Sequence, residues 1–123
     1  MDCIVTEQNA IKIPEDWGSL TWMANQKLLN TEGLTVGRVV IKKGRSNPCH
    51  IHPNSEEVLY LLEGELMHRI GTETVRLKKG DTILIPANVP HYADSVGDVD
   101  ADMIVTYPTN QRKIEFVDAP VVG

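Results

Sequence analysis

Apolar and polar residues alternate over short stretches along most of the chain. Alternation with a period of two predicts β-strands with one buried face, whereas the spacing of an amphipathic helix does not occur. Clusters of Gly, Pro, Asn and Asp separate these stretches and predict turns. The pattern therefore predicts an all-β sandwich or barrel with almost no helix. The predicted strands are residues 10–13, 19–23, 34–42, 57–63, 66–70, 74–77, 82–85 and 101–107.

One predicted strand does not alternate. Residues 58–62 read Val-Leu-Tyr-Leu-Leu and are apolar on both faces, whereas a strand with one solvated face should carry polar residues at every second position. A second sheet or a partner subunit must cover the outer face, so we expect a homodimer. The segment after Pro108, residues 109–123, mixes charged and apolar residues and is expected to add an edge strand or to lie over a neighbouring subunit.

Length and charge narrow the class of protein. The 123 residues correspond to one domain, 1–123, and the 41% of hydrophobic and 24% of charged residues are ordinary for a globular chain. The net charge of −5 disfavours nucleic acid as a partner. No apolar run approaches the roughly 20 residues that cross a bilayer, and the first residues do not resemble a signal peptide, so no membrane association and a cytoplasmic location are expected. Cys3 and Cys49 are expected to be reduced thiols.

Three of the four histidines follow a spacing typical of a metal site. His50 and His52 are two residues apart and share one face of an extended chain. Glu57 follows a turn at residues 53–55, and His91 comes from a later strand, just after Pro90. Three imidazoles and one carboxylate suit Mn, Fe, Co, Ni, Cu or Zn, with two further positions open if the ion is six-coordinate. We therefore predict a divalent transition metal held by His50, His52, Glu57 and His91.

The same residues resemble the two motifs of the cupin superfamily. The first motif, G-x5-H-x-H-x4-E-x6-G, is matched in full from Gly44 to Gly64, and the local sequence is similar to the germin branch. The second, G-x5-P-x-G-x2-H-x3-N, starts at Gly80 but has Asn88 in place of Gly and Ser95 in place of Asn. Asn tolerates the left-handed backbone best among non-glycine residues, and Ser95 can still form a local hydrogen bond.

The resemblance covers about residues 34–107. It implies a small jelly-roll β-barrel, also called a double-stranded β-helix, with the metal inside one end. The length is similar to that of stand-alone single-domain microbial cupins. Flanking strands and the C-terminal tail would complete the domain.

Two kinds of function are compatible with this reading. The first is a metal-dependent enzyme acting on a small organic molecule as an oxygenase, decarboxylase, isomerase or lyase. The second is a small-molecule-binding or sensor cupin without catalysis. The fold alone does not select between them.

Two further residues are candidates for contact with a substrate. His68 shares its face of strand 66–70 with two apolar residues, so it is expected to line the barrel interior, where it would contact substrate, orient a ligand or serve packing. Arg38 interrupts a strand that is apolar on both faces. It would either lie in the cavity and hold an anionic substrate or lie on the outer surface.

Overall fold

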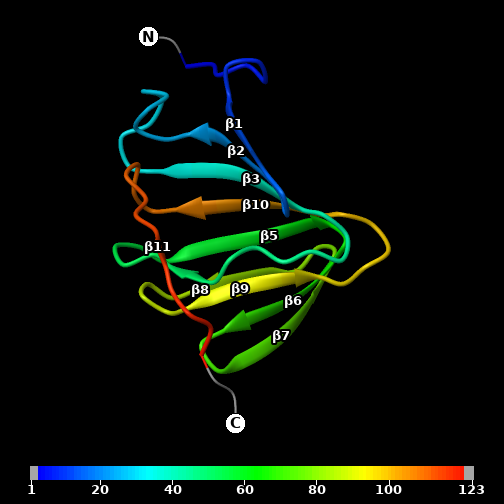
Figure 1. Ribbon diagram of the computed structural model, residues 1–123. Coiled ribbons are helices and arrows are strands. Elements are labelled where there is room, and N and C mark those ends of the chain that lie inside the picture. The colour runs from blue at the N-terminus through cyan, green and yellow to red at the C-terminus, as the bar shows by residue number, and fades with distance from the viewer. Residues whose placement is uncertain (1–2, 121–123) are drawn as a thin grey trace.

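Two antiparallel β-sheets pack face to face in the computed structural model, which describes residues 3–120 (Figure 1). One sheet has the order β1-β2-β3-β10-β5-β8 and the other β11-β4-β9-β6-β7. No helix occurs in the described part of the chain, and so none that could span a membrane. The strands are β1 (Ile11–Glu15), β2 (Gly18–Ala24), β3 (Thr35–Ile41), β4 (His50–Ile51), β5 (Glu57–Glu63), β6 (Glu65–Ile70), β7 (Glu73–Lys78), β8 (Thr82–Ile85), β9 (His91–Ser95), β10 (Ala101–Tyr107) and β11 (Glu115–Phe116).

The core lies between the sheets and follows from the alternation along each strand. On β10 every second side chain is buried, from Ala101 to Tyr107. Leu61 on β5 and Leu66 on β6 belong to opposite sheets, and both are fully buried. Burying such side chains drives the two sheets together, because each contributes about 1.5–3 kcal/mol relative to an exposed position. The all-β prediction is confirmed.

Strand pairing brings the predicted ligands together at one end of the barrel. β4 and β9 pair with His50 opposite His91. β5 belongs to the other sheet, and Glu57 is its first residue. Alternation predicted neither β4 nor β9, although His91 was expected to lie on a strand. β4 has only two residues, and β9 carries buried polar residues at His91 and Ser95, which hides the usual alternation.

The turns hold the backbone conformations that the motif glycines suggest. Gly44, Gly64 and Gly80 all have positive φ, at 78°, 87° and 96°. Asn88, which replaces the motif glycine, also adopts the left-handed region with φ 65°. Its N–H donates to the His52 carbonyl at 3.0 Å, so the substitution preserves a turn that supports a predicted ligand.

Ser95 differs from its expected role. Its hydroxyl is buried and has no hydrogen-bond partner among the described residues. The backbone carries the anchoring instead, since the Ser95 N–H donates to the Arg45 carbonyl at 2.9 Å and the Ser95 carbonyl accepts from Gly44 at 3.0 Å. The expectation of a local side-chain hydrogen bond is therefore wrong.

The segment after β10 turns back across one end of the barrel, in orange to red at the left of Figure 1. Its residues Glu115 and Phe116 pair with β4 as an edge strand of the five-stranded sheet. This confirms the first of the two alternatives for the tail. The last three residues of the predicted tail, 121–123, and the first two of the chain lie outside the described part.

Candidate metal centre

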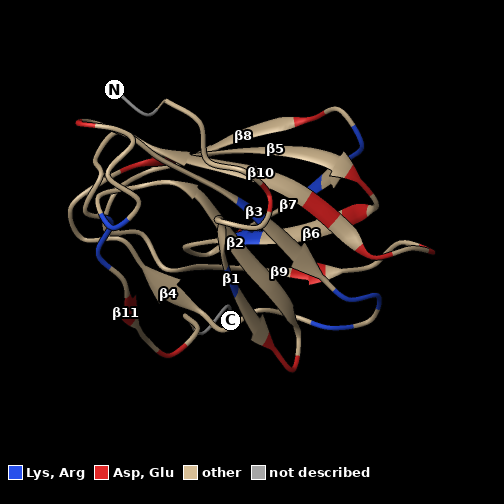
Figure 2. Cartoon of the chain, turned by 90° about the horizontal axis from the view of Figure 1, so that it is seen from above, with Lys and Arg blue, Asp and Glu red and all other residues tan. Residues whose placement is uncertain are grey.

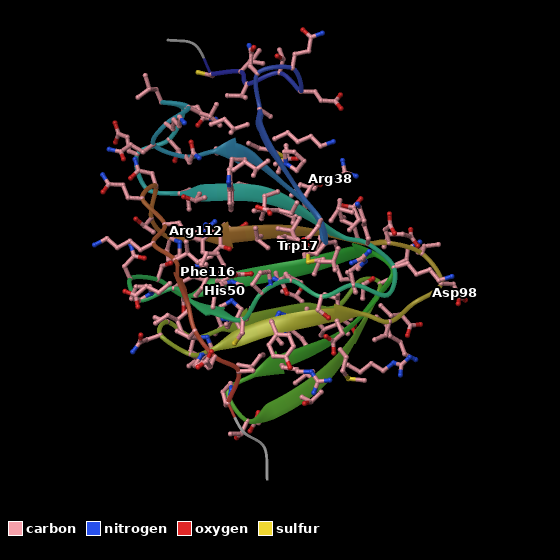
Figure 3. The ribbon with its side chains drawn as sticks, in the orientation of Figure 1. Trp17, Arg38, His50, Asp98, Arg112 and Phe116 are labelled. Atoms are coloured by element: carbon pink, nitrogen blue, oxygen red, sulfur yellow. The ribbon has the colours of Figure 1, made fainter. Side chains whose placement is uncertain are left out.

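Four buried side chains converge at the end of the barrel where the two sheets meet. His50, His52, Glu57 and His91 each offer one ligand atom, and these atoms all lie within 4.8 Å of one another. They are the four residues that the sequence predicts as ligands. Figure 3 shows His50 beside Phe116 of the C-terminal segment, and the two ring centroids are 6.4 Å apart.

The imidazoles are held in the tautomer that binds metal. The Nδ1 atom of His50 lies 2.7 Å from the Pro48 carbonyl, and that of His91 lies 2.9 Å from the Val89 carbonyl. The Nδ1 atom of His52 lies 2.9 Å from the carbonyl of Lys113. Because a carbonyl oxygen only accepts, each Nδ1 must carry the proton, which leaves each Nε2 with a free lone pair.

The lone pairs face a carboxylate. Oε1 of Glu57 lies 3.2 Å from Nε2 of His52 and 3.5 Å from Nε2 of His91. These two Nε2 atoms are buried and have no hydrogen-bond partner within residues 3–120. Acceptor atoms that crowd together away from water are costly unless a cation lies between them. The donor set fits a divalent transition metal, and a six-coordinate ion would keep two positions for a ligand.

Burial sets the ionisation of the site. It lowers the pKa of His50 to about 4, with a further lowering from His91, so His50 is neutral near pH 7. Burial opposes ionisation of Glu57, but a proton on Nε2 of His52 or His91 outweighs it in the metal-free site and holds the pKa of the Glu57 carboxyl below its usual range. A bound cation takes the place of that proton, which leaves the Nε2 lone pairs to the metal. Neutral imidazoles and an ionised carboxylate are the forms that bind a metal.

Tyr107 is a neighbour of the site that the ligand motifs do not include. Its hydroxyl donates to Oε1 of Glu57 at 2.9 Å, and its ring centroid lies 4.9 Å from that of His52. Burial and the Glu57 carboxylate raise the pKa of Tyr107 well above its usual value, so the hydroxyl keeps its proton and orients the carboxylate. A signal was present, because Tyr107 follows the inward alternation of Ala101, Met103 and Val105.

His68 lines the barrel interior, as predicted, but lies outside the cluster of four. It is 2% exposed, and its ring stacks beside that of His91 with centroids 6.0 Å apart. Its Nδ1 has no hydrogen-bond partner among the described residues. Burial lowers the pKa of His68 to about 4, so a neutral imidazole with an unused polar atom borders the cavity.

Arg38 does not reach the cavity. Its side chain lies on the outer face of β3, half exposed, and forms a two-pronged contact with the carboxylate of Asp102, with Nε to Oδ1 at 2.8 Å. The alternative that placed Arg38 in the cavity is wrong. The side chains of β3 that point into the barrel are those at the alternate positions, such as Val39 and Ile41.

A cavity of about 130 Å³ adjoins the four ligands. Its walls are mostly apolar, from residues such as Leu20, Leu59 and Met103. Arg112 and Phe116 of the C-terminal segment border it too. The sequence reading did not single out Arg112, because nothing in the local pattern shows that residues past β10 return to the barrel. The space suits a molecule of a few heavy atoms next to the metal.

The sequence of this chain is similar to those of known proteins. Residues 37–107 match the family model described as the Cupin domain. The chain is 32% identical over 104 residues to oxalate oxidase GF-2.8 of Triticum aestivum, an alignment that covers 76% of this chain and 46% of the wheat protein. The chain thus spans about half the length of such plant relatives.

Solved structures show the same fold. An oxalate oxidase in complex with the substrate analogue glycolate is 27% identical, with a TM-score of 0.76 over 83% of this chain and 56% of that chain. An oxalate decarboxylase of Bacillus subtilis, whose Mn(II) centres have been characterised by EPR, is 17% identical, with a TM-score of 0.81 over 86% of this chain and 29% of that chain. The second similarity concerns the fold alone.

Proposed function

The chain belongs to the cupin family, and on that basis we propose that it is a metal-dependent enzyme acting on a small organic acid. The observation that carries the proposal is that the four metal-ligand side chains lie beside an enclosed cavity. Three Nε2 lone pairs and the Glu57 carboxylate point to one position, and the cavity beside them has room for a small molecule.

The bound metal would supply a Lewis acid and, with Mn or Fe, a redox partner for dioxygen. The protein supplies the surroundings. Apolar walls exclude water and strengthen polar interactions within the cavity, and Tyr107 holds the Glu57 carboxylate in place. His68 remains the candidate for hydrogen bonding or proton exchange with a bound molecule, since it is the cavity histidine outside the ligand set.

Oxalate is the first substrate to test. The named relatives are an oxalate oxidase and an oxalate decarboxylase, and oxalate offers two oxygens to two open positions on a metal. Oxidation would consume oxalate, dioxygen and two protons and release two molecules of carbon dioxide and one of hydrogen peroxide. Decarboxylation would consume oxalate and one proton and release carbon dioxide and formate.

The test is to load the full chain with Mn(II), add oxalate and other small hydroxy and keto acids, and measure these products. We expect turnover that requires metal and is lost in His91→Ala. Binding of the acids in a thermal-shift assay without any product would overturn the enzyme proposal and favour the binding or sensor alternative.

We also propose that the chain is a homodimer that buries the outer face of β5 and β8. On this face Val58, Tyr60, Leu62 and Leu84 are 41%, 42%, 38% and 54% exposed, and Val58 pairs with Leu84 across the two strands. Apolar side chains grouped on a solvent-facing sheet are typical of an association surface. This exposed apolar patch on β5 and β8 is the observation that supports the homodimer.

Light scattering should therefore give a mass near twice 13.7 kDa. Tyr60→Glu is expected to shift the protein to monomers, because it places a charge in the middle of the apolar face. Ile13→Glu is the matched control, since Ile13 is 38% exposed on β1, at the opposite edge of the same sheet. A monomeric wild type, or equal effects of the two changes, would contradict the proposal.

A cytoplasmic location remains a prediction of the sequence. Fractionation of cells that express the full-length chain would test it. Recovery of the protein outside the cytoplasm would contradict it.

A further inference from the structure

The C-terminal strap, residues 111–116, crosses the end of the barrel that holds the four ligands. Asn54 fastens it on both sides, since its amide donates to the Gln111 carbonyl at 2.9 Å and its carbonyl oxygen accepts from the Lys113 N–H at 3.1 Å. His52 donates to the Lys113 carbonyl at 2.9 Å. The strap is thus tied directly to a metal ligand, and its side chains have defined positions relative to the cavity.

Arg112 carries a positive charge from this strap to the cavity wall. Its guanidinium lies over two aromatic rings, 4.5 Å from the ring centroid of Trp22 and 5.4 Å from that of Tyr107. Figure 3 shows Arg112 on the strap above His50, and Figure 2 shows the basic stretch that leads into β11. Stacking on two buried rings limits the side chain to few conformations.

Within the part of the chain that the structure describes, the N–H groups of the Arg112 guanidinium have no hydrogen-bond or ion-pair partner. No Asp or Glu among residues 3–120 forms an ion pair with Arg112. By contrast, Arg38, Arg69 and Arg76 each form an ion pair with a carboxylate. Arg112 is also the single Lys or Arg of the described residues that lines the cavity. The Trp22 and Tyr107 rings lie on neighbouring sides of the guanidinium, since their own centroids are 6.4 Å apart. The N–H groups that point away from the two rings remain for a ligand.

The charges around the cavity favour an anion. The imidazoles of the ligand set are neutral when bound to metal, so a divalent ion and Glu57 sum to about one positive charge. Arg112 adds a second positive charge at the same cavity. Glu15 is the other carboxylate of the lining and is exposed to solvent, so water screens its charge. A ligand with two negative charges would balance the two positive charges.

We propose that Arg112 binds a carboxylate of a ligand whose other end binds the metal, so that the site selects small organic dianions over monoanions. The in-plane N–H groups of a guanidinium match the two oxygens of a carboxylate. The inference rests on the proposed metal site, and it assigns the second anchor to a residue of the strap rather than to a strand of the barrel. Arg112 is thereby a specificity-determining residue.

Calorimetric titration of the Mn(II)-loaded protein with glycolate and with tartronate tests this assignment. Both are α-hydroxy acids that can chelate the metal, but tartronate has a second carboxylate. Wild type should bind tartronate at least ~10-fold more tightly than glycolate. Arg112→Gln should weaken tartronate binding by ~10- to 100-fold, as for loss of a charge-assisted hydrogen bond, and change glycolate binding by less than about 3-fold.

Lys113→Gln is the matched control, because it removes one positive charge from the strap at an exposed position that does not line the cavity. It should leave the ratio of the two affinities unchanged. Arg112→Lys should recover part of the preference, since it restores the charge without the planar pair of donors. Circular dichroism and the melting temperature report whether each variant keeps the native fold.

Three negative results are distinguishable. Normal glycolate binding together with the same affinity ratio in wild type and Arg112→Gln would overturn the role of Arg112 and leave the metal site intact. Absence of glycolate binding, with no Mn(II) retained by the wild-type chain, would overturn the metal site itself and with it the inference. A wild type that binds glycolate and tartronate equally would also overturn the inference.

Discussion

Replacing His50 by alanine should lower the affinity for Mn(II) or Zn(II) by more than ~100-fold while the barrel stays folded. Loss of an outer hydrogen bond to a metal ligand already costs about 10- to 100-fold in affinity, and this change removes a ligand. The fold should survive because the apolar core, with Leu61, Leu66 and Met103, packs without the histidine. Competition with a coloured chelator measures the affinity, and circular dichroism reports the fold.

His68→Gln is the control for the His50 variant. Both histidines are buried in the same cavity, but His68 does not belong to the cluster of four ligand atoms. The control should keep its metal affinity within a few-fold of wild type. If it loses metal as strongly as His50→Ala, the ligand set is wrong; if His50→Ala unfolds the chain, His50 or its metal is structural.

The second large effect concerns stability. Gly64→Ala should destabilise the protein by about 2–5 kcal/mol, which combines the cost of a side chain in the left-handed region with that of overpacking. Gly64 has φ 87°, and a Cβ there would lie 2.8 Å from Cα of Ala101 and 2.9 Å from the Asp100 carbonyl oxygen. Both contacts involve backbone, which cannot move aside cheaply.

Gly80→Ala isolates the conformational part of this cost. Gly80 has a similar φ of 96°, but a Cβ there would meet no atom within 4 Å. We expect a loss of about 1–2 kcal/mol from the backbone alone. Urea denaturation of both variants measures the difference, and similar losses at the two positions would show that the contact with Ala101 is relieved by a small shift.

Much of the fold could be read from short-range pattern. The eight predicted strands correspond to β1, β2, β3, β5, β6, β7, β8 and β10. No strand end differs from its predicted position by more than two residues. Alternation works there because each strand buries one face. It fails at β4 and β9, where most of the buried face is made of His50, His91 and Ser95, polar residues that a hydropathy pattern assigns to loops.

The outer face of β5 shows both what the pattern reveals and where it is ambiguous. Leu59 and Leu61 are buried, whereas Val58 and Tyr60 are exposed, so the apolar run does have an inner and an outer side. The same ambiguity concerned Arg38, because its strand β3 also has apolar residues on both faces. Its direction is determined by strand pairing, since β10 places Asp102 diagonally beside it on the outer face.

Three of the four ligands were accessible from the chain alone because their spacing is local, whereas His91, 34 positions after Glu57, was related to them by residue type and by the second motif. His50 and His52 share a face through the period of a strand, and the turn before Glu57 is short, so these positions are related whatever the rest of the molecule does. The motif glycines add turns whose backbone geometry few other residues adopt. Residue type, spacing and turn chemistry are enough to identify such a site and the class of metal that fits it.

Other features of the site depend on contacts between distant parts of the chain. Tyr107 bonds to a carboxylate 50 positions earlier, and the Lys113 carbonyl sets the tautomer of a histidine 61 positions earlier. Arg112 reaches the cavity because the strap folds back over the barrel. Such contacts follow from sheet order and strand register, which arise from the packing of all strands together. Alternation shows that Tyr107 points inward, but it does not show which distant residue a side chain or carbonyl meets.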